Sequence, residues 1–240
     1  MNILEELARL VVPVACPGCG LRDERLCEAC AVWLRGPLRR VEAQVPRLDD
    51  LSGRPSLPVW ALGSYEGPAR GMVVAYKDKG REDLAKVFAA ALRTAITSPS
   101  GRELLGAKVG AVVPMPSSRK AQRERGRSHL TPLAAQVAKE LGAKPIHLLR
   151  KDTGRDQVGL GARARGSAQV SVRNSIHRVP ARTPVLLFDD IVTTGATLAA
   201  ARVALTKAGF QVAGALVLVA TPPRSAQALQ GGLPKPPASS

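Results

Sequence analysis

The segment of the chain with the clearest chemistry is the run of thirteen residues from Val185 to Thr197. Four apolar residues are followed by the acids Asp189 and Asp190, and then by a short turn. This order is typical of a buried strand that leads through a turn into a helix. The first N–H groups of a helix are unpaired and attract anions, and α/β sheets bind ligands beyond the carboxyl ends of their strands. The residues expected at this anion site are Thr193, Thr194, Gly195, Ala196 and Thr197.

Two acids beside an anion site indicate that the ligand carries hydroxyl groups as well as phosphate. Carboxylates aimed at a phosphate would repel it, whereas they accept hydrogen bonds from sugar hydroxyls or hold a metal ion. The threonines of the turn add hydroxyl donors, and Gly195 lets the backbone approach the ligand closely. The pattern therefore favours a sugar phosphate. It is not a Walker A loop, because no Gly-Lys-Ser/Thr follows.

All four cysteines lie close together as two Cys-x-x-Cys pairs, Cys16 with Cys19 and Cys27 with Cys30. Two such pairs can place four thiolates around one tetrahedral ion, and zinc suits them better than an iron–sulfur cluster because nothing else here indicates redox chemistry. A pair of disulfides is the alternative, which a reducing compartment disfavours, and redox activity of one Cys-x-x-Cys pair is another. With four sulfur ligands and no open position, zinc would be structural rather than catalytic.

The chain is strongly basic, with 35 Lys and Arg against 19 Asp and Glu and a net charge of +16 over 240 residues. Between Met115 and Arg182 there are fifteen cations and four acids. Such a field attracts phosphorylated small molecules and nucleic acid alike, and a merely solvated Arg-rich surface is the alternative. Few aromatic residues are present for base stacking. The cations expected to contact single-stranded DNA are Arg119, Lys120, Arg123, Arg125 and Arg127.

Strands that alternate with helices from Val59 onward predict an α/β domain with a parallel sheet covered on both faces. The strands are expected at 59–65, 109–113, 185–188 and 212–219, and the helices at 81–97, 130–141 and 196–208. The predicted organisation is an N-terminal helix with the Cys unit at 1–37, a polar linker at 38–58, the α/β domain at 59–222, and a disordered tail at 223–240.

The N-terminal segment has an amphipathic helical pattern that Pro13 ends. Its apolar positions are Ile3, Leu4, Leu7, Leu10 and Val11. Acids stand near its start, where a signal peptide would carry positive charge. The longest apolar run, at 212–220, is shorter than the roughly 20 residues that a membrane span needs. These features predict a soluble, cytoplasmic protein without a membrane span.

The run at 185–197 closely resembles the phosphoribosyl pyrophosphate (PRPP) motif of type I phosphoribosyltransferases, with four apolar residues, two acids and Thr-Thr-Gly-x-Thr. The resemblance implies their Rossmann-like parallel sheet. It also implies that Asp189 and Asp190 bind the ribose hydroxyls, and that residues 193–197 hold the 5-phosphate. Hypoxanthine-guanine enzymes carry an Asp at the place of Thr193, so a role in 6-oxopurine salvage is disfavoured.

The order of a four-cysteine zinc knuckle, a linker and a phosphoribosyltransferase domain resembles the ComF/ComFC family of competence proteins. The chain departs from the family at Arg127 and Ser128, where Phe and Asn are usual. The matching stretches are Lys77-Asp78-Lys79-Gly80, Val113-Pro114-Met115-Pro116, Arg123-x-Arg125-Gly126, and Gln157-Val158-Gly159-Leu160 followed by Arg163 and Arg165.

This second resemblance implies a cytoplasmic role in DNA uptake during natural transformation, with PRPP, single-stranded DNA and other DNA-uptake proteins as partners. A PRPP-dependent enzyme of nucleotide metabolism and a catalytically inactive regulator of the same fold are the alternatives. Loss of pyrophosphate from PRPP calls for Mg²⁺ and cationic side chains. Asp189, Asp190 and Lys77 are the expected catalytic residues, and Arg125 and Arg155 the expected additional PRPP contacts. The lone His129 and His147 receive no role.

Overall fold

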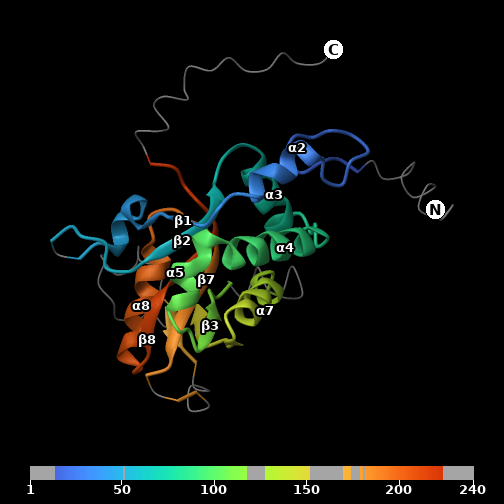
Figure 1. The fold of residues 1–240 in the computed structure, drawn as a ribbon. Helices are drawn as coiled ribbons and strands as arrows, with labels where there is room; N and C mark the ends of the chain where they lie inside the picture. The colour runs from blue at the N-terminus through green and yellow to red at the C-terminus, as the bar shows by residue number, and fades with distance from the viewer. Residues whose placement is uncertain are drawn as a thin grey trace, which may run out of the picture.

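The structure, a computed structural model, describes residues 14–50, 52–117, 128–151, 170–173, 179–180 and 182–223. A six-stranded sheet of order β1-β2-β8-β7-β3-β4 runs through this part of the chain (Figure 1). The strands from β2 to β4 are parallel, and β1 pairs antiparallel with β2 at one edge. The strands of this sheet are β1 (Arg39–Arg40), β2 (Val59–Ser64), β3 (Ala111–Pro114), β4 (Lys144–Pro145), β7 (Pro184–Val192) and β8 (Gln211–Ala220). A separate antiparallel pair joins β5 (Leu149–Lys151) to β6 (Val170–Val172).

The central strands are apolar along their length because helices cover both faces of the sheet. Residues 185–188 of β7 and 215–220 of β8 are all buried. The structure confirms the four predicted strands within a few residues at each end. The main difference is in β7, which does not end at Phe188 but continues through both acids to Val192. Asp189 and Asp190 therefore belong to the strand itself, which fixes their backbone.

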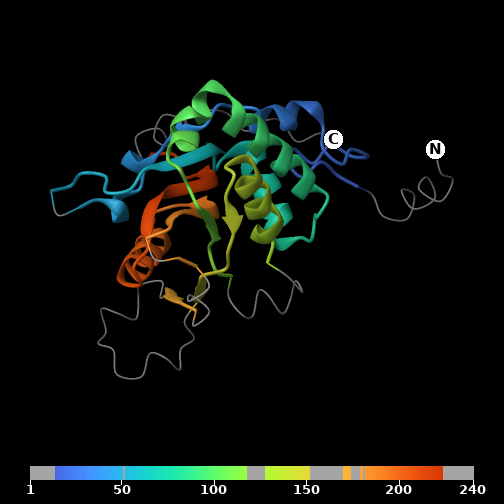
Figure 2. The same cartoon turned by 60° about the horizontal axis from the view of Figure 1, so that its bottom comes forward.

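Helices α3, α4 and α7 cover one face of the sheet, and α8 lies on the other (Figures 1 and 2). The connection from β2 to β3 crosses the sheet toward the β4 edge, whereas the connection from β7 through the next helix to β8 crosses toward the β1 edge. Because both crossovers are right-handed, the two connections lie on opposite faces of the sheet. None of the helices in the described ranges is long and apolar enough to cross a membrane. The helices are α2 (Glu28–Ala31), α3 (Gly67–Asp78), α4 (Leu84–Thr97), α5 (Arg102–Gly106), α7 (Leu130–Glu140) and α8 (Ala196–Lys207), with short 3-10 turns η1 (Val32–Leu34), η2 (Glu42–Gln44), η3 (Pro46–Leu48) and η4 (Pro99–Gly101).

The segment 38–58 is not the separate linker that its polar composition predicted. It contributes the edge strand β1 and the turns η2 and η3 to the α/β domain. Its apolar side chains are buried in the same core as the sheet, namely Leu38, Val41, Val45, Leu48 and Leu57. These residues are spaced irregularly between charged residues and prolines, so neither a helical nor a strand period shows in the sequence. Burial of the five side chains joins the N-terminal part of the chain to the sheet.

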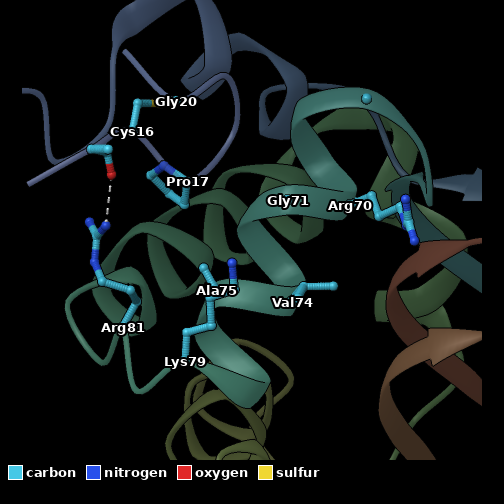
Figure 3. Close-up of a pocket in the computed structure, with 11 residues that line it drawn as sticks. Cys16, Pro17, Gly20, Arg70, Gly71, Val74, Ala75, Lys79 and Arg81 are labelled. Atoms are coloured by element: carbon cyan, nitrogen blue, oxygen red, sulfur yellow. Dashed lines mark hydrogen bonds between the residues drawn. The ribbon is translucent and has the colours of Figure 1, made fainter. Parts of the chain in front are cut away.

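The cysteine-containing unit packs directly against α3. A Cβ atom added at Gly71 of that helix would lie 2.2 Å from the carbonyl oxygen of Pro17, so the helix and the unit touch at a position that only glycine fits. Arg81 strengthens the contact, since its guanidinium donates to the carbonyl oxygens of Arg25 (2.6 Å) and Ala15 (3.1 Å). Figure 3 shows the second of these hydrogen bonds. The two parts of the chain are therefore held by close backbone packing and by one shared cation.

Replacement of Gly71 by alanine should weaken this contact. Alanine normally stabilises a helix relative to glycine by about 1 kcal/mol, but at position 71 its methyl group would force Pro17 away from α3 at a cost of about 1–3 kcal/mol. Gly106→Ala in α5 is the matched control, because nothing lies within 4 Å of its added Cβ atom. Denaturant unfolding should show that Gly106→Ala is neutral or stabilising and that Gly71→Ala is destabilising. Equal effects of the two substitutions would contradict the close contact.

Candidate functional site

The topology of the sheet places a ligand site at the carboxyl ends of β7 and β3. The connection after β3 leads outward to β4, whereas the connection after β7 leads back to β8. Neighbouring strands whose connections leave in opposite directions open a crevice between them, and α/β sheets bind their ligands there. The residues at this crevice are Asp189 and Asp190 from β7 and the stretch that follows Pro114 of β3.

Asp190 is the centre of a buried polar cluster at this edge. Only 3% of the residue is exposed, and its Oδ2 atom accepts from Lys77 Nζ of α3 and from His129 Nε2, each at 2.8 Å. Its other oxygen accepts from the backbone N–H of Ile191 at 2.8 Å. Tyr76 supports the cluster, because its hydroxyl donates to the His129 carbonyl oxygen at 2.5 Å. One carboxylate thus joins α3, the start of α7 and β7.

These contacts shift the pKa values of the pair in opposite directions. Burial alone would raise the pKa of Asp190, but the hydrogen bond from His129 and the positive charge of Lys77 hold it below its ordinary value. Burial lowers the pKa of Lys77, and the Asp190 carboxylate more than offsets this and raises it. The two residues therefore form an ion pair at neutral pH. The Lys77 side chain is 32% exposed, so part of it is accessible from the crevice.

Asp189 lies in a different environment from its neighbour. Side chains alternate between the two faces of a strand, so Asp189 points away from the face that α3 and α7 cover. Its Oδ1 accepts from the Asp190 backbone N–H at 2.9 Å. Desolvation and the nearby Asp190 carboxylate raise the pKa of Asp189 well above its ordinary value. Lys77 and His129 donate to Asp190, whereas Lys77 acts on Asp189 through its charge.

The turn between β7 and α8 has the features of an anion-binding loop. Thr193 and Thr194 are exposed, and Gly195 adopts a left-handed conformation with φ of 80° immediately before the helix. The positive end of the twelve-residue helix α8 and its first unpaired N–H groups attract negative charge to this point. Thr197 is half-buried in the first turn. The loop therefore offers hydroxyl groups and backbone donors to one small anion.

Residues of the segment 38–58 hold this loop in place. The backbone N–H of Arg47 donates to the Thr194 carbonyl oxygen at 3.0 Å. A Cβ atom at Gly195 would lie 2.2 Å from Val45 Cγ1 and 3.2 Å from Leu48 Cγ, so the loop backbone rests on these two side chains. Gly195 is therefore required both by its positive φ and by this close approach. The ligand loop depends on residues far from it in the sequence.

The structure brings together Asp189, Asp190, Lys77 and the loop from Thr193 to Thr197, which the sequence predicted as one site. The other predicted phosphate contacts, Arg125 and Arg155, and the predicted DNA contacts Arg119, Lys120, Arg123 and Arg127 lie outside the described residues. Sequence reasoning missed His129, which touches Asp190. The one available signal was its position close to the Arg-Gly stretch at 125–126. The sequence could not show the contact itself, because that contact depends on how α7 packs over the sheet.

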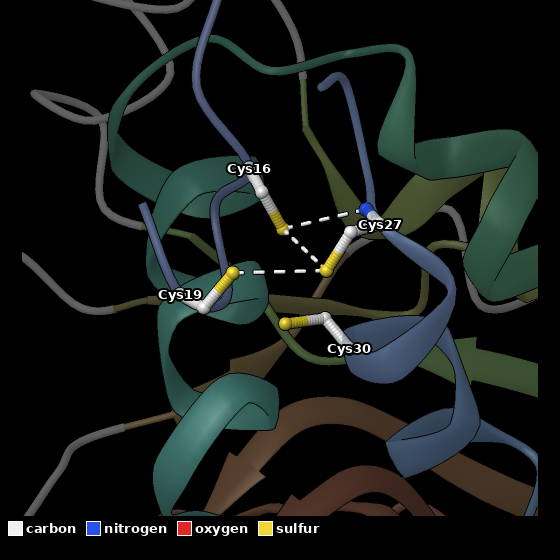
Figure 4. A group of neighbouring side chains, drawn as sticks. All are labelled: Cys16, Cys19, Cys27 and Cys30. Carbon is white, nitrogen blue, oxygen red and sulfur yellow. Dashed lines mark hydrogen bonds between the residues drawn. The ribbon is translucent and has the colours of Figure 1, made fainter. Parts of the chain in front are cut away.

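The four cysteines form a second site in the N-terminal unit (Figure 4). Their Sγ atoms all lie within 4.8 Å of one another. The Sγ atom of Cys27 is 3.7 Å from that of Cys16 and 3.6 Å from that of Cys19. A zinc ion with bonds of about 2.3 Å to four sulfurs keeps them about 3.8 Å apart, so the cluster has the size of a zinc site. The four cysteines could therefore bind one zinc ion.

The environment of Cys16 favours the thiolate form that metal binding needs. Burial raises the pKa of its thiol, but hydrogen bonds from backbone N–H groups, of Cys27 above all, lower it to about 6. The pKa of Cys30 is raised, first by burial and then by the neighbouring sulfurs, as expected where several thiolates converge without a cation. A divalent cation would relieve this repulsion between the sulfurs. The donor set is all sulfur and has no open position for a substrate.

Two adenine phosphoribosyltransferases, one curated sequence and one solved structure, show similarity to the chain. No family model matches it. A curated adenine phosphoribosyltransferase from Polynucleobacter asymbioticus is 43% identical over 65 residues, which make up 27% of this chain and 35% of that protein. The solved structure of an adenine phosphoribosyltransferase from Thermoanaerobacter pseudethanolicus aligns with a TM-score of 0.35 and 14% identity, covering 76% of this chain and 95% of that one. Over 65 residues, the mixed α/β chain is thus similar in sequence to a phosphoribosyltransferase.

Proposed function

We propose that the chain binds PRPP or a related sugar phosphate at the carboxyl edge of β7. The observation that carries this proposal is the loop from Thr193 to Gly195, which places two exposed hydroxyls at the positive end of α8 directly after two acids. A 5-phosphate would accept from the loop hydroxyls and the first N–H groups of the helix. The ribose hydroxyls would donate to the acids, foremost to Asp189, because Asp190 already accepts from Lys77 and His129.

Lys77 suits the pyrophosphate end of the ligand. Its ammonium is held at the crevice by Asp190 and its side chain is partly exposed, so it would stabilise negative charge without a large rearrangement. In a transfer reaction the bond between C1 and the pyrophosphate oxygen breaks, and a nitrogen nucleophile forms the new bond at C1 and loses its proton. Arg125 and Arg155 are proposed to assist Lys77. Mg²⁺ would neutralise the leaving pyrophosphate, and Asp189 offers a carboxylate that could help to hold it.

As the biological role, we infer a ComF-type function in DNA uptake during natural transformation, carried out in the cytoplasm. It is supported by the resemblance of the motif order to that family and by the fifteen cations between Met115 and Arg182. Single-stranded DNA or other DNA-uptake proteins would be the partners. A phosphoribosyltransferase of nucleotide metabolism is the second candidate, favoured by the 65 residues that resemble adenine phosphoribosyltransferase. A catalytically inactive regulator with the same fold is the third.

Deletion of the gene separates these roles. Loss of transformation with unchanged growth on purine and pyrimidine bases would support the DNA-uptake role, and the reverse pattern would support the metabolic one. A third outcome is lost transformation that is restored by a variant unable to bind PRPP. That result would indicate that the fold acts without its ligand.

For the cysteine cluster, we propose one structural zinc ion bound by Cys16, Cys19, Cys27 and Cys30. The size of the cluster and the low pKa of Cys16 support it. The ion would supply no catalytic step, and would instead hold the turn at residues 16–20 against α2.

Elemental analysis of protein purified without added metal should find one zinc ion per chain. Cys27→Ser should abolish binding, because three sulfurs hold zinc far more weakly than four. Removal of zinc should also free the unit from α3, which limited proteolysis near Pro17 would detect. Lys139→Ser, at an exposed site on α7 outside the cluster, should change neither result. Four free thiols without bound metal would contradict the assignment.

Calorimetric titration with PRPP and Mg²⁺ tests the ligand site. Thr194→Ala and Asp189→Asn should each weaken binding by about one to two decades, which corresponds to one lost hydrogen bond to a charged group. Thr206→Ala is the matched control, since Thr206 is exposed at the opposite end of α8 and should leave the affinity unchanged. Equal affinity of all three variants and the parent protein would rule out this site. Asp190 is unsuited to the test because its loss would leave Lys77 and His129 without their buried acceptor.

Salt-dependent binding to single-stranded DNA tests the basic segment. Each neutralised phosphate contributes about −0.7 to the log–log slope of affinity against salt, so combined replacement of Arg119, Lys120 and Arg123 by alanine should reduce the slope by about two. A triple variant of the exposed Arg54, Arg93 and Lys139 removes the same charge elsewhere. Identical slopes for the two triple variants would refute a specific role of the segment. Failure of the parent protein to bind at low salt would mean that DNA is handled through a protein partner.

A further inference from the structure

A groove of about 610 Å³ lies between η1 and α4. The residues that line it are distant in sequence from the ligand loop. Its apolar surface comes from Ala31, Leu34, Val87, Ala90, Ala91 and Ala95. Two cations, Arg35 and Lys86, also line it, and Arg35 pairs with Glu28. The groove is thus mostly apolar and carries two cations in its lining.

The flank of α4 that forms this groove is only partly covered by the described chain. The core face of the helix buries Leu84, Phe88 and Leu92. Val87 and Ala91 lie next to them on the helix surface, yet they are only half-buried, and Ala90 is exposed. The apolar stripe of α4 is therefore wider than the part that the sheet and α7 cover. Small side chains along it would let a second helix approach closely.

We propose that residues 1–13 of the same chain, which lie outside the described residues, pack into this groove as an amphipathic helix. Their apolar positions repeat at helical spacing and would form one continuous face, which needs a covering surface. That face consists of Ile3, Leu4, Leu7, Leu10 and Val11. It would span about 12 Å of helix, and the groove from Lys86 to Ala95 follows α4 for about 14 Å. The two apolar surfaces therefore match in length.

The charge pattern of residues 1–13 and their covalent connection to the cysteine unit favour this segment as the occupant of the groove. On such a helix Glu6 would flank the apolar face and could pair with Lys86 in the groove lining, whereas Arg9 would lie on the opposite side. The described chain begins at Val14, two residues before Cys16, whose sulfur lies within 4.8 Å of the sulfur of Cys30. Ala31, the next residue, lines the groove. Two residues span at most about 7 Å, so the segment starts near the cysteine cluster that adjoins Ala31, and Pro13 would end the helix there.

Hydrogen exchange of the full chain, measured by mass spectrometry, tests this packing. Leu7→Asp would put a charge into the apolar face, and amide exchange in residues 86–95 should become at least about tenfold faster, the effect of losing one buried leucine. Arg9→Asp is the matched control on the opposite side of the same segment and should leave exchange in α4 unchanged. Ala90→Asp should reproduce the effect from the groove side, with fast exchange appearing in residues 3–11.

Three outcomes would overturn the proposal. Unchanged exchange of α4 in Leu7→Asp would mean that residues 1–13 do not cover the groove. Equal effects of Leu7→Asp and Arg9→Asp would show that the apolar face is not responsible. Protection of α4 that grows with protein concentration in the parent chain would assign the groove to a second copy. Loss of protection in Leu7→Asp and Ala90→Asp alone, independent of concentration, supports intramolecular packing.

Discussion

The buried carboxylate of Asp190 is the interaction on which the candidate ligand site depends. A charge with 3% exposure is costly unless it is fully hydrogen-bonded, and here Lys77, His129 and the Ile191 N–H all donate to it. These donors come from three parts of the chain that are distant in sequence. The need to satisfy one acid therefore fixes how α3 and the start of α7 lie against β7. It also leaves an ammonium group at the edge where a phosphorylated ligand would enter.

On the other side of the crevice, too, residues that are distant in sequence position the site. In the loop before α8, Thr193 and Thr194 are exposed and only Gly195 is buried. It is positioned by Val45 and Leu48, which touch Gly195, and by the hydrogen bond from Arg47 to Thr194. Arg202 of α8 further ties the helix to the carbonyl oxygen of Ser56 at 2.9 Å. A segment that resembles a linker in composition thus supports the loop that would bind phosphate.

Much of this arrangement could be predicted from the sequence because its signals are local. Apolar runs located the central strands, the spacing of apolar residues located α4 and α7, and the paired cysteines predicted their own cluster. The contact of His129 with Asp190 could not be predicted, since it depends on the packing of α7 over β7. The role of residues 38–58 was also hidden, because their buried side chains follow no regular period. In both cases tertiary packing, rather than local pattern, decides the outcome.

The two edges of the sheet bear on how the protein behaves at high concentration. Exposed strand edges offer unpaired backbone groups to which another chain can add, which is one route to aggregation. Here the outer strands β1 and β4 are each two residues long, and their sequences are Arg39–Arg40 and Lys144–Pro145. Such short strands offer few unpaired backbone groups, and proline lacks the N–H that a neighbouring strand would need. A core of fully apolar strands is thereby protected from growing into an intermolecular sheet.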